Sequence, residues 1–265
     1  MIEPLQPSDP RLLATSTREP FQPARVYFDI PSKAAVTRAF RELGCVGQEH
    51  GGASWIWLYQ DEAASIAFNI AYADIPKQVQ PLVLGRFRFP ATNKMVLEVR
   101  SFERASAAAK FFGPLFGPTV VARRVRVINR WFHADEIEKG LDRLDRLLDA
   151  NVTVIDPLQT ERELEEAMAA ARTQREKRLA FHAHSDRQRR KDVPLVEDFP
   201  LAPEEETPDF LHLTMTLRWR TVRAWEHWKG NTHLTLADLI HRTVAEGIAA
   251  GRIEDVPWPP GWEPP

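Results

Sequence analysis

The sequence predicts an α+β fold in which a mixed or antiparallel sheet is covered by helices on one face. Segments with the two-residue period of strands follow one another directly, and helical segments interrupt them at only a few positions. Residues 90–94 separate two of these strand segments by a length that suits a hairpin. The resulting order β-α-β-β-β-β-α-β-α suggests a ferredoxin-like sandwich, by analogy of architecture alone.

The first elements follow a proline-rich N-terminal arm. Residues 1–23 contain five prolines and show no sustained period, so we expect an arm that lies over the surface or is disordered. A strand over 25–30 comes next, and Ser32 is placed to cap a helix that continues to Leu43. Alternating apolar residues then predict four strands, over 54–59, 65–72, 82–89 and 95–100.

A second group of elements completes the predicted α+β domain over residues 24–156. An Ala-rich helix over 102–112 has Phe102, Ala105, Ala109 and Phe112 facing inward, and Gly113 followed by Pro114 is expected to end it. A strand over 120–132, a helix over 135–150 and a short strand over 152–155 follow.

Four further regions follow this domain. Residues 157–192 predict one charged helix with an acidic start and a basic end, an order that complements the helix dipole. Residues 193–209 contain four prolines, six acidic residues and no Lys or Arg, which indicates a linker. Residues 210–252 predict a strand-helix-helix piece, because 211–220 alternate strictly between apolar and polar, and residues 253–265 form a tail rich in Pro and Trp.

The bulk composition excludes several classes of protein. The 265 residues include 35 Lys+Arg and 37 Asp+Glu, for a formal net charge of −2, and the single Cys45 has no partner for an intramolecular disulfide. The chain has no apolar run long enough to cross a membrane, and its first residues lack the pattern of a signal peptide, so we expect a cytoplasmic protein without a membrane partner. Motifs for phosphate-binding loops, dinucleotides, nucleophilic serines and redox cysteines are missing, so no cofactor is expected.

Arginine dominates the predicted polar sides of the strands. These sides carry seven arginines but only two acidic residues, Asp29 and Glu98. Arg218 and Arg220 are added to the arginines if residues 211–220 belong to the same sheet. Guanidinium groups bind phosphates and stack on bases, so such a face suits RNA, single-stranded DNA or another anion. The alternatives are a solvated face with cross-strand ion pairs, or an interface with an acidic protein. The seven arginines are Arg25, Arg86, Arg88, Arg100, Arg124, Arg126 and Arg130.

Histidines supply the candidates for metal binding and acid-base chemistry. His182, His184 and Asp186 have the H-x-H-x-D spacing of some metal-dependent hydrolases, although the cationic neighbours favour an ordinary end of a surface helix. His50 lies in a Gly-rich loop where a general base can sit, with Asp29 as a second candidate, and a turn histidine is the alternative.

Exposed aromatic residues are candidates for contacts with partners. Phe116 belongs to a doubled Phe-Gly-Pro sequence, which either docks a partner or plugs the core at a rigid turn. Trp258 and Trp262 in the tail form either a short motif for a protein groove or a segment that packs on its own domain. Trp131 and Trp219 are possible stacking surfaces for bases if they turn outward.

These features favour a non-catalytic binding or adaptor protein that contacts RNA or single-stranded DNA through the arginine-rich face and a protein through its C-terminal region. A small hydrolase or transferase acting on a phosphorylated substrate is the second hypothesis, with the same arginines holding the substrate and His50 or Asp29 moving protons. A structural subunit of a larger assembly is the third, and it requires an acidic partner over the arginines.

Overall fold

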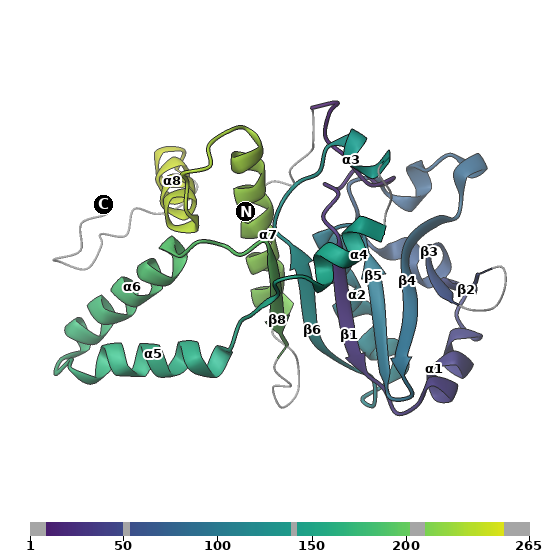
Figure 1. Cartoon of the computed structure of the whole chain (residues 1–265), viewed down its shortest axis with the longest axis horizontal. Coiled ribbons are helices and arrows are strands. Elements are labelled where there is room, and N and C mark those ends of the chain that lie inside the picture. Colours follow the sequence, from purple (N-terminus) through teal and green to yellow (C-terminus); the bar gives the residue numbers. More distant parts are fainter. Residues whose placement is uncertain (1–8, 50–53, 139–141, 202–209, 252–265) are drawn as a thin grey trace. The chain divides into compact units, whose positions relative to one another are not determined.

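The computed structural model describes residues 9–49, 54–138, 142–201 and 210–251 (Figure 1). The chain forms two compact units. The first, termed the sheet unit, consists of Met1–Ile155 and Pro194–Thr221, and the second, termed the helical unit, consists of Asp156–Val193 and Val222–Pro265.

An eight-stranded mixed sheet forms the framework of the sheet unit, which confirms the predicted α+β fold (Figure 1). The strand order is β2-β3-β4-β5-β1-β6-β8-β7, and only the pair β7 and β8 is parallel. The strands are β1 (Ala24–Asp29), β2 (Val46–Gln48), β3 (Trp55–Tyr59), β4 (Leu82–Ala91), β5 (Lys94–Val99), β6 (Val121–Ile128), β7 (Thr153–Val154) and β8 (Val196–Pro200).

One face of this sheet carries the main hydrophobic core. Alternate residues of the strands point into it, such as Val26 and Phe28 of β1, which are almost fully buried. Leu213 and Leu217 join the same core from a helix near the end of the unit. The helices that contribute to this core are α1 (Lys33–Phe40), α2 (Phe102–Phe116) and α7 (Phe210–Trp228), which enters the helical unit after Thr221.

The opposite face of the sheet has a smaller cover. Helix α4 (Asp142–Asp149) lies in front of the strands in Figure 1, and α2 lies behind them. The short helix α3 (Ala134–Glu138) precedes α4 in the chain. Leu144 and Leu148 of α4 form a second cluster with Ile128 and Val196. The sheet is therefore covered broadly on one face and locally on the other.

Several local predictions are confirmed. Ser32 caps α1 by accepting a hydrogen bond from the backbone N of Ala35, and Ser101 caps α2 in the same way. Strands β4 and β5 form the predicted antiparallel hairpin. The four residues expected to face inward from α2, namely Phe102, Ala105, Ala109 and Phe112, are all buried.

The prediction of a strand over residues 211–220 is wrong, because this segment belongs to helix α7. Its alternating apolar residues also contain a helical pattern: Leu213, Leu217, Thr221 and Ala224 are buried at a spacing of three and four residues. Met215, which a half-buried strand would place beside them, is 41% exposed. Helical packing on the core therefore overrides the two-residue period.

The predicted linker and the predicted single charged helix are also corrected. Residues 196–200 of the expected linker form β8, which pairs with β6 and brings acidic residues into the sheet. Residues 157–192 form two helices, α5 (Pro157–Ala169) and α6 (Gln174–Arg190), because Thr173 and Glu176 form a capping box that starts a new helix. With α8 (Leu236–Ala249) and the end of α7, these helices form the helical unit.

Two further boundaries differ from the prediction. The expected strand over 65–72 lies among short 3-10 turns, η1 (Asp61–Ser65), η2 (Tyr72–Asp74) and η3 (Lys77–Val79). Helix α2 does not stop at Gly113 but continues past Pro114 to Phe116, where Gly117 ends it with a φ of 73°. The helix predicted over 135–150 corresponds to α3 and α4, and residues 139–141 between them lie outside the described residues.

None of the helices in the described ranges has the length and hydropathy that crossing a bilayer requires.

Candidate binding face of the sheet

The predicted arginines of β1, β4 and β6 do lie on one face of the sheet, opposite the main core. Three of them, Arg86, Arg25 and Arg126, belong to one row of residues that crosses every strand of the sheet. Each residue of this row pairs directly with the next. The row contains arginines and carboxylates side by side near its centre. In strand order, its members are Gly47, Ile56, Arg86, Glu98, Arg25, Arg126, Asp198 and Val154.

Arg25, at the centre of the row, is fully committed to partners within the chain. Its Nε donates to Glu98 at 3.0 Å, its Nη1 to Asp149 at 2.7 Å and its Nη2 to Asp145 at 3.3 Å. Only 9% of the side chain is exposed. Because Asp145 and Asp149 belong to α4, Arg25 holds this helix on the sheet rather than offering a site to a ligand.

Arg126 is occupied in a similar way. Its Nε and Nη2 each donate to a different carboxylate oxygen of Asp198 at 2.8 Å, in a bidentate pair. Its Nη1 donates to the carbonyl of Leu148 and to Asp149. The hydrogen bond with Asp198 raises the pKa of Arg126, and the paired carboxylate is almost completely buried. Arg126 therefore fastens β8 and α4 to β6.

Arg86 and Arg88 of β4 are more open. Their side chains are 46% and 49% exposed. In the part of the chain that the structure describes, each reaches carboxylates through one terminal nitrogen: Arg86 Nη2 donates to Glu49 at 2.6 Å, and Arg88 Nη2 lies 2.9 Å from Glu98 and 3.6 Å from Asp145. Because a guanidinium carries five N–H donors, both side chains retain donors for a ligand.

Arg124 of β6 is the third half-exposed arginine of this face. Its side chain is 42% exposed, and its Nη1 donates to Asp198 at 3.0 Å. The guanidinium lies 4.0 Å above the ring of Tyr27, and Arg126 lies 5.4 Å from the same ring. This cation-π contact holds the Arg124 guanidinium over the Tyr27 ring, while 42% of its side chain remains exposed.

The face is therefore close to charge balance, unlike the predicted excess of seven arginines over two carboxylates. Local strand patterns missed Asp145 and Asp149, which lie on α4, and Asp198, which lies in the segment expected to be a linker. One signal was available in the sequence. Asp145 and Asp149 each follow directly after Leu144 and Leu148, the apolar residues by which α4 docks, so that the carboxylates lie beside the docking stripe.

Arg100 lies at the border of this group, on the same side of the sheet as Glu98 two residues earlier. It is half-buried with its guanidinium 5.9 Å from the ring of Phe21, and burial lowers its pKa, while the charges of Glu98, Asp145, Arg86 and Arg88 also act on it. The remaining predicted arginines lie elsewhere. Arg130 pairs with Glu136 at 2.8 Å beyond the end of β6. Arg218 and Arg220 lie on helix α7, so the expectation that they extend the strand face is wrong.

Arg220 has a structural role on the core face of the sheet. Its Nε and Nη2 donate to the two carboxylate oxygens of Glu197 at 2.7 and 3.0 Å. Asn129 also donates to this carboxylate, which is 3% exposed. The bidentate pair therefore joins α7 to β8.

The acid-base and stacking candidates gain little support. Asp29 accepts from Lys94 and from Arg123, and the hydrogen bond from Lys94 is the main cause that lowers its pKa, so Asp29 stays ionised and paired. Trp131 is 4% exposed and cannot receive a base, while Trp219 is half-buried on α7. His50 lies outside the described residues.

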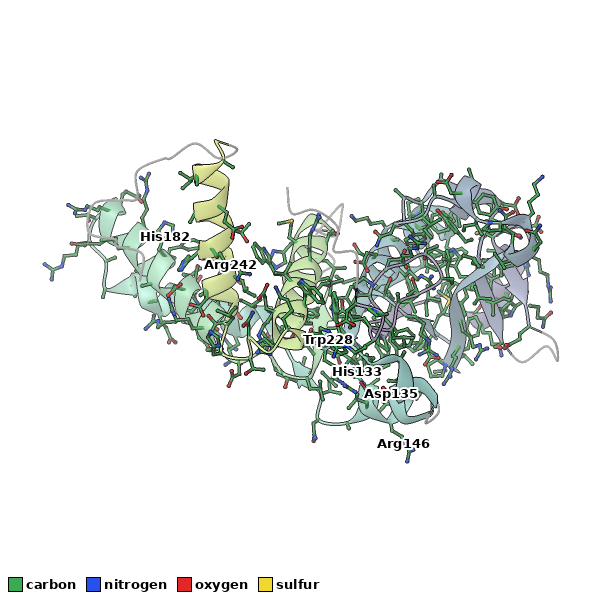
Figure 2. The ribbon with its side chains drawn as sticks, turned by 90° about the horizontal axis from the view of Figure 1, so that it is seen from above. His133, Asp135, Arg146, His182, Trp228 and Arg242 are labelled. Atoms are coloured by element: carbon green, nitrogen blue, oxygen red, sulfur yellow. The ribbon has the colours of Figure 1, made fainter. Side chains whose placement is uncertain are left out.

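The proposed metal ligands are engaged in helix packing. His184 is buried with its Nε2 3.4 Å from Gln188 Nε2, and Asp186 pairs with Arg190 at 2.7 Å and lies 3.5 Å from His241. His182 is labelled on α6 in Figure 2. Within the described ranges, no group of three or more His, Cys, Asp or Glu side chains is placed to hold a metal ion.

The predicted partner-binding aromatics divide in two. Phe116 stacks on Phe112 with 5.4 Å between ring centroids and lies 5.5 Å from Phe40, so it packs against the core rather than forming an exposed tip. Trp258 and Trp262 lie outside the described residues. The role predicted for the tail is untested.

A buried charged cluster was missed entirely by the sequence analysis. Glu19 of the N-terminal arm and Arg104 of α2 are both withdrawn from solvent, and Thr17 Oγ1 donates to Glu19 and accepts from Arg104 Nη2. Burial raises the pKa of the neighbouring Glu103 to about 7, and the charge of Glu19 adds to this. The cluster fixes the described part of the arm, residues 9–23, to the sheet unit, so of the two predicted alternatives the structure agrees with an arm laid on the domain and not with a disordered one.

The arrangement of the face gives two classes of arginine. Arg25 and Arg126 use all their side-chain nitrogens to hold the fold, whereas Arg86, Arg88 and Arg124 are half-exposed and retain N–H donors.

Comparisons of the chain with protein-family models, with curated proteins and with solved structures found no match.

Proposed function

We propose that this protein is a non-catalytic binding protein that contacts RNA or single-stranded DNA through Arg86, Arg88 and Arg124. The observation that supports this proposal is the half-exposed state of these three guanidinium groups on one sheet face. Each retains N–H donors that can reach phosphate oxygens.

The existing ion pairs do not prevent such contacts. An exposed ion pair contributes only about 0–1 kcal/mol to stability, so a phosphate can replace or join Glu49 beside Arg86 at small cost. Arg25 and Arg126, in contrast, pair with carboxylates in buried surroundings, and breaking such pairs is costly. The backbone of a nucleic-acid strand would therefore bind along the three half-exposed arginines, while Arg25 and Arg126 keep their ion pairs and maintain the fold.

The other two hypotheses are less well supported. A hydrolase or transferase needs a group that exchanges protons near neutral pH, and the ion pairs with Lys94 and Arg123 occupy Asp29 and lower its pKa, which makes it a weak base. The other candidate, His50, lies outside the described residues. A structural subunit needs an acidic cover over the arginines, and this chain supplies part of that cover itself through Asp149 and Asp198.

Fluorescence anisotropy of labelled single-stranded RNA and DNA, at ~50 and ~200 mM salt, tests the proposal. Binding should weaken steeply with salt, and an Arg86→Glu/Arg88→Glu variant should lower both the affinity and the salt dependence, with a loss of about 0.7 in slope per phosphate contact. The matched control is Arg38→Glu/Arg41→Glu, which reverses two exposed charges at the end of α1.

The proposal fails if the unmodified protein binds neither nucleic acid. It also fails if both double variants lose affinity equally, because a general loss of positive charge would then explain the result. A pull-down for an acidic protein partner would follow in either case.

A further inference from the structure

Helix α6 carries a second group of cations, in the helical unit. The helix begins at a capping box formed by Thr173 and Glu176, so its start is fixed by local interactions. One side of α6 contacts α8, where Asp186 lies 3.5 Å from His241 and Arg190 lies 3.5 Å from Asp238. A different side presents a set of exposed residues to solvent.

This exposed side, termed the α6 surface, consists of Lys177, Arg178, Phe181 and Arg189. At 100° per residue, the four positions fall within about a third of the helix circumference, and all are exposed. Arg178 and Arg189 are about 16 Å apart along the helix axis, which is long enough to meet several phosphates of one strand.

The carboxylates of α6 lie away from this surface and are already engaged. Glu176 accepts from the backbone N of Arg172 and of Thr173, and Asp186 accepts from Arg190. On α5, Glu163 accepts from Gln188 and lies 3.8 Å from Lys191. The four residues of the α6 surface include three cations and no acid. Around the helix Gln188 falls between Lys177 and Phe181, so the Glu163 carboxylate that it contacts borders this surface and is the one acidic group placed there among the described residues.

Phe181 is the unusual member of the surface. Its side chain is 45% exposed, and it is the one aromatic residue among the large hydrophobic side chains that the described ranges leave exposed. The ring meets His182 edge to face, with 5.7 Å between centroids (His182 is labelled in Figure 2). Single-stranded nucleic acids are bound by this combination of an exposed aromatic ring with cations around it.

We infer that the α6 surface binds single-stranded nucleic acid, with Phe181 stacking on a base and Lys177, Arg178 and Arg189 contacting phosphates. This inference takes its ligand class from the proposed function but places contacts on a different unit of the chain. On the sheet face the ring of Tyr27 lies beneath Arg124, whereas the ring of Phe181 is open to a base.

An anionic lipid surface is recognised by related chemistry, but α6 does not fit it well. A helix that lies in a membrane interface needs a continuous apolar face, whereas Leu179 and Phe181 are the only large apolar residues of α6. The aromatic ring and the cations therefore favour nucleic acid.

The experiment compares Phe181→Ala and Lys177→Glu/Arg178→Glu in the full chain. The probes are a labelled single strand of about 20 nucleotides and a duplex of the same length. Phe181→Ala should weaken single-strand binding about tenfold and leave its salt dependence and duplex binding unchanged, because only stacking is lost. Lys177→Glu/Arg178→Glu should lower the salt slope by about 1.4. Phe181→Tyr, which retains a ring, should bind like the unmodified protein.

The variants of α6 and of the sheet face separate the two proposals. If Arg86→Glu/Arg88→Glu loses affinity and the α6 variants do not, the inference about α6 is overturned and the proposed function stands. The reverse result supports the α6 surface and contradicts the sheet face. Binding to phosphatidylserine vesicles that depends on Phe181, without binding to the single strand, overturns the inference in favour of a lipid. Absence of binding to every probe also overturns it.

Discussion

Arg104 of α2 and Glu19 of the N-terminal arm form an ion pair that is withdrawn from solvent on both sides, with 3.5 Å between Nε and Oε2. Further hydrogen bonds surround the pair. Arg104 Nη1 donates to the carbonyls of Val83 and Leu84, and Thr15 and Thr17 both donate to Glu19. The arm is therefore joined to α2 by an ion pair that is almost completely buried, and Arg104 extends this network to β4.

Removing the guanidinium should destabilise the sheet unit strongly. Arg104→Ala leaves the Glu19 carboxylate buried without its cation, and such a change costs about 3–5 kcal/mol of unfolding free energy. Urea unfolding measures the loss, with Arg38→Ala on the exposed side of α1 as the control, expected within about 0.5 kcal/mol of the unmodified protein. A loss below 1 kcal/mol for Arg104→Ala would show that water reaches the pair.

Glu103 should make the protein less stable as the pH rises. Burial, and then the charge of Glu19, raise its pKa from 4.5 to about 7, and its Oε2 has no hydrogen-bond partner among the described residues. Between pH 4.5 and 7 the folded state keeps a proton that the unfolded state has lost, so stability falls across this interval by up to about 3 kcal/mol.

Glu103→Gln tests this expectation, because it removes the titration while keeping the size of the side chain. Unfolding measured from pH 5 to 8 should show a smaller decrease for the variant than for the unmodified protein. Carboxylates whose pKa is lowered, such as Asp29, have finished titrating below this range and do not obscure the comparison. Parallel curves for the two proteins would contradict the assignment.

Helix caps, the hairpin and the inward face of α2 were predictable, because each depends on residues close together in the sequence. Ser32 needs only Ala35 to cap its helix, and the Phe102, Ala105 and Phe112 face depends on a spacing of three and four residues. Where two local patterns coincide, the sequence does not choose between them. Leu213 and Leu217 belong equally to an alternating strand and to a helical stripe, and packing on the core decides for the helix.

The candidate site was less predictable, because its charge depends on pairing between distant segments. Asp198 lies in a stretch rich in proline and acid, where nothing local indicates a strand. It becomes buried because Arg126, 72 residues away in the sequence, donates to both of its oxygens. The sequence predicted that Arg86 and Arg126 lie on one face. It did not predict their carboxylate partners, which leave Arg86 half-exposed and bury Arg126.

The pair between Asp198 and Arg126 should be more important for stability than the exposed pair at Arg86. Asp198→Asn removes the charge opposite Arg126 at a buried position, and we expect the unfolding free energy to fall by about 3 kcal/mol. This value is near the lower limit for breaking a buried pair, because Arg126 keeps its ion pair with Asp149. Arg86→Ala breaks a pair that is half-exposed on both sides and should cost at most about 1 kcal/mol. Chemical denaturation of both variants makes the comparison, and equal losses would contradict the division of the arginines into two classes.

In the helical unit, Glu226 should supply stability that is lost in acid. Burial alone would raise its pKa, but hydrogen bonds from Lys229, Asn231 and Arg242 outweigh burial and lower the pKa to about 2. Arg242, labelled in Figure 2, belongs to α8, so this carboxylate joins the end of α7 to α8.

Because the folded state holds Glu226 ionised at a pH where the unfolded state has taken up a proton, its contribution is complete above about pH 4.5 and disappears as the pH falls toward 2. Glu226→Gln should therefore lower stability at pH 7, by on the order of 2 kcal/mol, and the difference from the unmodified protein should shrink in acid. Far-ultraviolet circular dichroism during urea unfolding at pH 7 and pH 3 measures both values. The matched control is Glu246→Gln, because Glu246 is 65% exposed and lies 4.0 Å from the same Arg242. A difference for Glu226→Gln that is the same at both pH values would mean that the carboxylate acts through packing, and its charge would have no part in holding α8.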